Sequence, residues 1–271
     1  VWVNEPKISS NDIYSFMNKP NILITNDDGI YSEGIYALWE AMGEVGNPFV
    51  VAPNTEQSGS GHGITLNNPL RVNKITRSNG FKGYAVTGSP ADCTKIGIRS
   101  LMKSNPDILI SGINQGANLG TNLIYSGTVS AATEGAVLGI PSIAISLASF
   151  KTSDFDLAKT VAIDTVKHVL RYSLPKGTLL NVNVPCCDKD QINGTRITKQ
   201  GNQYFVDEYE KRTDPSHKDY YWIKGDIIDD DSSIDYDGKA ISENYISITP
   251  IHFKLTNEQY LKELVSQITD E

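Results

Sequence analysis

Two adjacent carboxylates follow the first apolar run of the chain. Ile22–Thr25 has the composition of a buried strand, and the tetrapeptide Asn26-Asp27-Asp28-Gly29 comes directly after it. Asp27 and Asp28 would repel each other in one site unless a cation lay between them, and carboxylate oxygens are typical ligands of divalent metals. A turn in which these side chains only bond the neighbouring backbone is the alternative, and this motif by itself leaves both interpretations open.

Two further polar segments are expected at the same place. Residues 111–120, Ser-Gly-Ile-Asn-Gln-Gly-Ala-Asn-Leu-Gly, follow a strand at Ile108–Ser111 and offer amide oxygens, although a simple glycine-rich turn also fits them. Tyr125–Thr128 opens an alanine-rich helix, whose free N–H groups and dipole suit an anion, although plain N-capping by Ser126 or Thr128 is the alternative. Because the carboxyl ends of parallel strands share one edge of a sheet, we expect these segments to meet there.

The loop from Gln57 to Pro69 is too long for a tight connection and is therefore a candidate functional loop. The glycines in its first part, Gln57–Gly63, do not fit the dinucleotide fingerprint G-x-G-x-x-G, but the loop could supply a hydroxyl ligand. A flexible loop without a site is the alternative interpretation. A phosphatase of the haloacid dehalogenase type would need a nucleophilic Asp two residues before Asp28, where Asn26 stands.

A second acidic segment resembles part of a calcium-binding EF-hand loop. It is Ser233–Gly238, and Asn244 stands where that loop needs a bidentate Glu. We therefore expect a solvated acidic loop rather than a calcium site.

The elements that must position these residues alternate between short β-branched runs and helical patterns from residue 21 to residue 185. This alternation predicts an α/β fold with a Rossmann-like, doubly wound, mainly parallel sheet. After Pro185, charged and Tyr-rich segments predict a C-terminal β-hairpin or extended arm, and Asn257–Ile268 has the spacing of a terminal helix. The expected domains are an N-terminal extension with no assigned role (1–20), the core (21–185) and the C-terminal arm and helix (186–271).

The composition excludes several classes of protein. With 24 Lys+Arg against 32 Asp+Glu in 271 residues, the formal charge is −8, which argues against binding to polymeric nucleic acid or to an anionic membrane surface. Residues 135–148 form the longest weakly polar run, which is interrupted by Pro141 and is shorter than the roughly 18 residues of a membrane span. Residues 1–20 show no secretory signal, and the three cysteines form no Cys-x-x-Cys pattern, so we expect reduced thiols and a cytoplasmic location.

Five motifs in order along the chain give it a family likeness. Together they resemble the SurE (survival protein E) nucleotidases, and the likeness runs from about Asn21 to Phe253. The motifs are Asn26-Asp27-Asp28-Gly29, Gln57-Ser58-Gly59, Gly88-Ser89-Pro90-Ala91-Asp92-Cys93, Ser111-Gly112-Ile113-Asn114 with Asn118-Leu119-Gly120, and Tyr125-Ser126-Gly127-Thr128. Ser89 departs from the family pattern, since Thr is usual at this position.

The resemblance implies a metal-dependent phosphomonoesterase that acts on nucleoside 5′-monophosphates, often on 3′-monophosphates, and in some members on short polyphosphate. It implies one divalent ion, Mg²⁺ or Mn²⁺, and a homodimer or homotetramer with an exchanged C-terminal arm. Asp27 and Asp28 would be catalytic, and the residues leave open which one accepts a proton from water or whether one attacks directly. The implied metal ligands are Asp27, Asp28, Ser58 and Asn114, and the implied phosphate-binding residues are Asn118, Ser126, Gly127 and Thr128.

Two other functions stay open at this point. A non-catalytic module could sense a nucleotide by binding its phosphate at the helix that begins near Ser126. A serine hydrolase could use Ser126 as nucleophile, but none of the four histidines is identifiable from the sequence as its base.

Overall fold

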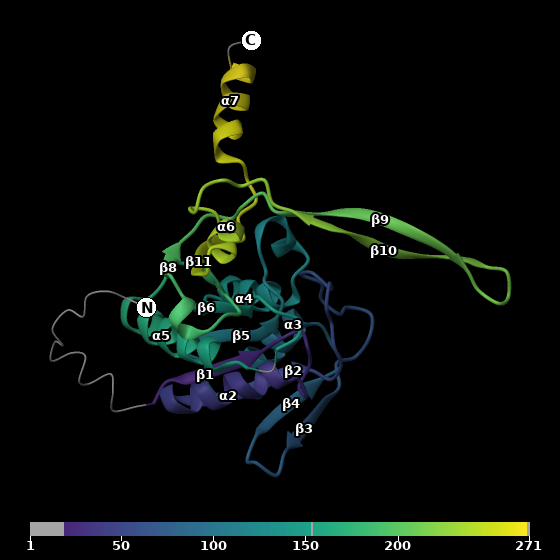
Figure 1. Cartoon of the computed structure of the whole chain (residues 1–271). Coiled ribbons are helices and arrows are strands. Elements are labelled where there is room, and N and C mark those ends of the chain that lie inside the picture. The colour runs from purple at the N-terminus through teal and green to yellow at the C-terminus, as the bar shows by residue number, and fades with distance from the viewer. Residues whose placement is uncertain (1–18, 153, 270–271) are drawn as a thin grey trace.

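A mixed sheet forms the centre of the molecule (Figure 1). The computed structural model describes residues 19–152 and 154–269, and within these residues the sheet has nine strands in the order β3-β4-β2-β1-β5-β6-β7-β11-β8. The N-terminal extension predicted over 1–20 lies outside the described residues except for its last two. The strands are β1 (Asn21–Thr25), β2 (Asn47–Pro53), β3 (Val72–Thr76), β4 (Lys82–Val86), β5 (Ile108–Gln115), β6 (Ser142–Leu147), β7 (Thr178–Val184), β8 (Gly194–Ile197) and β11 (Tyr245–His252).

The six central strands, from β4 to β7, all run parallel to their neighbours, and the predicted mainly parallel α/β fold is confirmed. β3 pairs with β4 in the antiparallel sense at one edge. Parallel strands covered by helices on both faces carry apolar residues in succession, and Ile22, Leu23 and Ile24 of β1 are all fully buried.

Helices cover both faces of the sheet, as a doubly wound fold requires. α2 (Glu33–Val45) and α5 (Asp156–Tyr172) pack together on one face, and α3 (Pro90–Ile96) and α4 (Gly127–Val137) on the other. Their starts follow from capping residues: the Ser32 hydroxyl caps α2, and Ser89 forms a capping box with Asp92 at α3. Short helical turns cover residues 97–101, 120–124 and 189–191.

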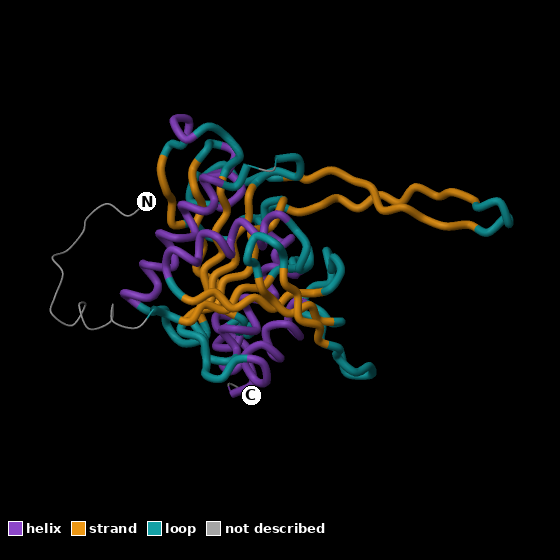
Figure 2. The backbone as a smooth tube through the Cα atoms, turned by 90° about the horizontal axis from the view of Figure 1, so that it is seen from below, coloured by secondary structure: helices purple, strands orange, loops and turns teal. Residues whose placement is uncertain are grey.

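The C-terminal segment divides between the sheet and two projecting elements. β11 pairs antiparallel with β7 and parallel with β8, so two of the segments expected in hairpins or an arm extend the main sheet instead. β9 (Tyr204–Thr213) and β10 (Asp219–Ile228) form the expected hairpin, which reaches far from the body (Figure 2). The short α6 (Asp237–Ser242) follows the hairpin, and the expected terminal helix is α7 (Glu258–Thr269), which projects from the body in Figure 1.

Membrane-spanning helices are absent from the described part of the chain, where none combines sufficient length with sufficient apolar character.

Candidate active site

The turn after β1 is built by Asn26 and not by the two aspartates. Asn26 Oδ1 accepts a hydrogen bond from Gly29 N at 3.2 Å, and Asn26 Nδ2 donates to Gly29 O at 3.1 Å and to Ser32 Oγ at 2.8 Å. The turn predicted as the alternative to a metal site therefore exists, but it does not occupy Asp27 or Asp28. Both carboxylates remain for other partners.

Asp27 lies directly against the first turn of α4. The Thr128 hydroxyl donates a short hydrogen bond to Asp27 Oδ1, and the Thr128 N–H also bonds this carboxylate. A Cβ atom added to Gly127 would lie 2.6 Å from Asp27 Cβ, so only glycine allows this approach. The acidic motif and the N-terminus of the predicted anion-binding helix, about 100 residues apart in the sequence, therefore form one site.

Burial raises the pKa of Asp27 above its ordinary value, although the hydrogen bonds from Thr128 oppose this effect. The pKa of Asp28 rises to about 7, first because burial disfavours the charged form and then because Asp27 and Glu56 repel a further negative charge. The N–H of Gln115, at the end of β5, bonds the Asp28 carboxylate and opposes the rise. Without a cation nearby, the site therefore disfavours the ionised forms of both Asp27 and Asp28.

The two other implied metal ligands lie on the neighbouring loops. Gln57 N donates to Asp27 O at 2.8 Å, which brings Ser58 next to the acidic motif, but the Ser58 hydroxyl donates to Glu56 Oε1 at 2.7 Å. Asn114 is half-buried at the end of β5 and its Nδ2 donates to Gly116 O at 2.7 Å, so its amide oxygen is the atom left for a ligand.

Glu56 is a member of this site that the sequence interpretation missed. The only available signal was its position immediately before Gln57-Ser58-Gly59, a motif used for the family likeness.

Ser126 provides the N-cap of α4. Its Oγ accepts from Val129 N at 3.1 Å, and its side chain is almost fully buried. Capping and anion binding are compatible here, because one hydroxyl satisfies only one of the four free N–H groups in a first helical turn.

Asn118 belongs to a buried amide network that the sequence interpretation also missed. Its backbone N–H donates to Asn183 Oδ1 and its Nδ2 to Ser146 Oγ, both at 2.8 Å. Its carbonyl oxygen accepts from the side chains of Asn181 at 2.9 Å and Asn183 at 3.0 Å. The network fixes the loop after β5, and its signal in the sequence is the pair of Asn residues within the largely apolar β7.

Residues from the C-terminal part of the chain also hold the loop after β5. Asp237 is fully buried, and its carboxylate accepts from the N–H groups of Gly120 at 3.1 Å, Gly201 at 2.9 Å and Gly238 at 2.8 Å. The expected solvated acidic loop is therefore wrong at this residue, because three backbone donors substitute for water. The carbonyl oxygen of Gln203, next to β9, accepts from the Thr121 N–H at 2.8 Å.

The loop that contains Ser58 is tied both to the turn before α4 and to α4 itself. Gly61 N donates to Tyr125 O at 3.1 Å, and His62 Nε2 lies 2.8 Å from Glu134 Oε2. Lys95 of α3 also contacts Glu134, with Nζ 2.8 Å from Oε1. These contacts, the one to His62 above all, hold the pKa of Glu134 below its ordinary value despite its burial.

The donor set determines what the site can bind. Among the described residues no group of three or more His, Cys, Asp and Glu could hold a metal ion, so a cation here would need amide, hydroxyl or water oxygens besides the two aspartates. Asp27, Asp28 and Asn114 supply hard oxygen atoms of the kind that Mg²⁺ and Mn²⁺ accept. The site therefore fits a small divalent cation beside a helix end that can bind an anion. The molecule is a doubly wound α/β protein, and proteins of this class bind phosphate-containing ligands at the carboxyl ends of their strands.

Comparison with known proteins gives the family. The model of the family described as "Survival protein SurE" matches residues 22–207, and the chain belongs to this family. A protein named 5′-nucleotidase SurE from Thermosipho africanus is 48% identical over 92% of this chain and 98% of its own length. Another of the same name, from Heliobacterium modesticaldum, is 45% identical over 90% of each chain.

A solved structure supports the same assignment. The crystal structure of the Sure protein from Aquifex aeolicus superimposes with a TM-score of 0.78 at 41% identity, and it covers 90% of this chain and 98% of the other.

Proposed function

We propose that this chain is a 5′-nucleotidase that hydrolyses nucleoside 5′-monophosphates, and 3′-monophosphates as well, with the help of one divalent cation. The names of its relatives support the reaction class. The observation that carries the proposal is the contact between Asp27 and the first turn of α4, because it joins a cation-binding carboxylate to an anion-binding helix end.

The proposed metal ligands are Asp27, Asp28, Ser58 and Asn114, and the metal is Mg²⁺ or Mn²⁺. Ser58 would have to turn its hydroxyl from Glu56 toward the aspartates, a rotation that its exposed position permits. When bound, the cation would neutralise charge on the phosphoryl group and lower the pKa of a bound water.

The remaining steps fall to the chain's own groups. The N–H groups of Gly127 and Thr128, with the Ser126 hydroxyl and Asn118, would hold the phosphoryl oxygens against the carboxylates. Thr128 fixes the orientation of Asp27 through its hydroxyl, so it acts on the carboxylate as well as on the phosphate. One carboxylate of the Asp27–Asp28 pair would accept the proton of the attacking water.

Phosphate release from AMP, measured with and without EDTA, tests this function. We expect EDTA to abolish release and Mn²⁺ or Mg²⁺ to restore it. Asp28→Asn should lose at least 100-fold in turnover, since it removes a ligand and a charge, while Asp190→Asn, at an exposed aspartate away from the site, should behave as wild type. Release that is insensitive to EDTA, or near-normal turnover of Asp28→Asn with Mn²⁺, would contradict the proposal.

The same assay separates the two alternatives. A sensing module would bind AMP without releasing phosphate. A serine hydrolase would lose all turnover in Ser126→Ala, yet the Ser126 hydroxyl serves as a helix cap and His62 bonds Glu134 instead.

We also propose that copies of the chain associate as a homodimer or homotetramer through the C-terminal arm. Val206, Tyr209, Trp222 and Ile227 are exposed on the hairpin, and a two-stranded hairpin in water is marginally stable alone. Light scattering should give a molar mass that is a multiple of the chain mass, 29.7 kDa. Replacing residues 204–228 with a short linker should lower the number of chains in the assembly. A monomeric full chain would contradict this arrangement. We also propose a cytoplasmic location, in which the thiols of Cys93, Cys186 and Cys187 would stay reduced.

A further inference from the structure

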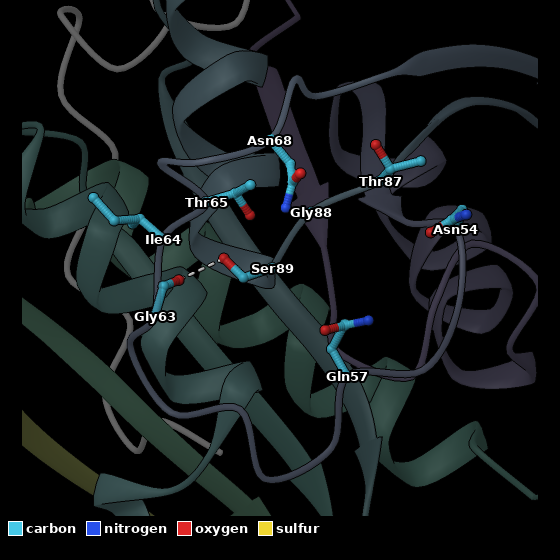
Figure 3. A pocket seen from close by; sticks show the side chains of 9 residues that line it. All are labelled: Asn54, Gln57, Gly63, Ile64, Thr65, Asn68, Thr87, Gly88 and Ser89. Atoms are coloured by element: carbon cyan, nitrogen blue, oxygen red, sulfur yellow. Dashed lines mark hydrogen bonds between the residues drawn. The ribbon is translucent and has the colours of Figure 1, made fainter.

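Residues 58–62, which we call the Ser58 loop, lie between two fixed points of the chain. Before the loop, Gln57 N donates to Asp27 O at 2.8 Å. After it, the Ser89 hydroxyl at the start of α3 donates to Gly63 O at 2.6 Å, the contact drawn dashed in Figure 3. The conformation of the Ser58 loop itself must therefore come from contacts between these points.

The Ser58 loop has little structure of its own. Gly59 and Gly61 have φ angles of +71° and +55°, in the left-handed region that favours glycine. Ser58, Gly59 and Ser60 are exposed. Because glycine loses more conformational freedom on ordering than any other residue, holding this loop in one conformation requires contacts with the rest of the protein.

Two hydrogen bonds supply these contacts. Gly61 N donates to Tyr125 O at 3.1 Å, and His62 Nε2 lies 2.8 Å from Glu134 Oε2 of α4. An ionised carboxylate can only accept, so His62 Nε2 is the donor. Among residues 58–62, all of which the structure describes, the side chain of His62 alone bonds another element.

Glu134 does not need His62 as a partner for its charge. Its side chain is only 6% exposed, but Lys95 Nζ of α3 lies 2.8 Å from Oε1. The Thr94 hydroxyl also joins the two helices, because it donates to Ala131 O of α4 at 3.1 Å. Glu134 therefore lies on a support that α3 and α4 form without the Ser58 loop, and the contact with His62 fastens the loop to this support.

Helix α4 connects this contact to the candidate active site. Gly127 and Thr128, at the start of the helix, lie against Asp27. Glu134 is on the same helix, two turns or about 10 Å further along its axis. The helix that positions the acidic motif thus also positions the loop that carries Ser58.

We propose that His62 is a positioning residue: its contact with Glu134 holds Ser58 at the acidic site, where Ser58 can bind the cation. This inference rests on the proposed function, because it takes Ser58 to be a metal ligand. If the contact is lost, the loop presents Ser58 only part of the time, and the apparent affinity for the metal falls by that fraction.

The test compares His62→Ala with Lys95→Ala in Mn²⁺ titrations without substrate, followed by the electron paramagnetic resonance signal of free Mn²⁺. Each variant removes one partner of Glu134, but only His62 belongs to the Ser58 loop, so Lys95→Ala is the matched control. We expect His62→Ala to bind Mn²⁺ about three- to tenfold more weakly, the effect of one lost hydrogen bond, and Lys95→Ala to bind it like wild type. Unchanged affinity in His62→Ala, or an equal loss in both variants, would overturn the inference.

A double-mutant cycle with Ser58→Ala separates positioning from a general loss of structure. Ser58→Ala should itself weaken Mn²⁺ binding. Addition of His62→Ala should then weaken it no further, because the ligand that His62 positions is already gone. Losses that add in the double variant would show that His62 acts by another route, and the inference would fail.

Amide hydrogen exchange of the metal-free protein gives a measurement that does not depend on the metal. The Gly61 N–H, which bonds Tyr125 O, is the reporter. It should exchange at least about threefold faster in His62→Ala and at the wild-type rate in Lys95→Ala, since local opening controls exchange. An unchanged rate in His62→Ala would overturn the inference. If wild type binds no Mn²⁺, the proposed function fails, while faster exchange in His62→Ala alone would still identify His62 as the residue that holds the loop.

Discussion

Asp28→Asn should make the metal-free protein more stable while it removes activity. The pKa of Asp28 rises from 3.8 to about 7 on folding, which means that its ionised form is less stable in the folded protein than in the unfolded chain. At 1.36 kcal/mol per pH unit, this difference corresponds to roughly 4 kcal/mol. Because water screens part of the half-buried side chain, we expect about 2 kcal/mol. An uncharged amide at this position avoids that cost.

The sign of the pH dependence follows from the same shift. Between pH 3.8 and about 7 the folded state binds more protons at Asp28 than the unfolded chain, so this group lowers the free energy of unfolding as the pH rises through that window. Above pH 7 its unfavourable contribution is complete and constant. Asp28→Asn should therefore be most stabilised, relative to wild type, at pH 7.5 and little changed at pH 4.

Urea unfolding followed by circular dichroism measures this effect, with EDTA present and the protein concentration held constant. Addition of Mn²⁺ should then raise the stability of wild type, because a ligand that binds only the folded state stabilises it, and should raise that of Asp28→Asn far less. Asp190→Asn is the control and should follow wild type. An Asp28→Asn protein that is no more stable than wild type without metal, or that gains as much from Mn²⁺, would refute the electrostatic account of this site.

Three further changes test neighbouring parts of the site. Gly127→Ala should cut turnover at least tenfold without changing the circular dichroism spectrum, because the new methyl group would lie 2.6 Å from Asp27 Cβ; full activity would contradict this contact. Ser126→Ala should lower the free energy of unfolding by about 1 kcal/mol through the lost cap and raise KM for AMP, with residual turnover retained; a loss of all turnover would favour a nucleophilic serine. Since the pKa of Glu134 is lowered on folding, its contribution is present above pH 4.5 and is lost as the pH falls further, so Glu134→Gln should weaken the protein at pH 7 and flatten its acid unfolding curve; identical curves would show that the contacts to His62 and Lys95 contribute nothing.

The parallel core could be predicted because its signals are local. Buried β-branched runs such as Ile22–Thr25, each followed by a helical pattern, specify strands with helices on both faces. The meeting of the acidic motif with the start of α4 also followed, since parallel strands present their carboxyl ends at one edge. The sequence could not show which side chain forms the turn, because Asn26 and Asp27 have similar turn preferences.

The missed features depend on contacts between distant parts of the chain. The sequence predicts hairpins or an extended arm for the segments of β8 and β11, because a strand's pattern does not identify its partner. The antiparallel partner of β11 is β7, more than 60 residues earlier. Asp237 was expected in water because nothing nearby in the sequence indicates its three backbone donors, two of which lie on other segments. Similarly, the partners of Asn118 on β7 become visible only when the strands are aligned.

The base of the β9–β10 hairpin is hydrogen-bonded to the loop after β5. Gln203, just before the hairpin, accepts from the Thr121 N–H, and Asp237, which follows the hairpin, accepts from the Gly120 N–H, so the two contacts lie three and two residues from Asn118. A displacement of the hairpin by a neighbouring molecule would therefore shift the backbone at the proposed phosphate site. If copies of the chain associate through this hairpin, as proposed, mutations that change self-assembly would also change turnover, because both would act through these hydrogen bonds.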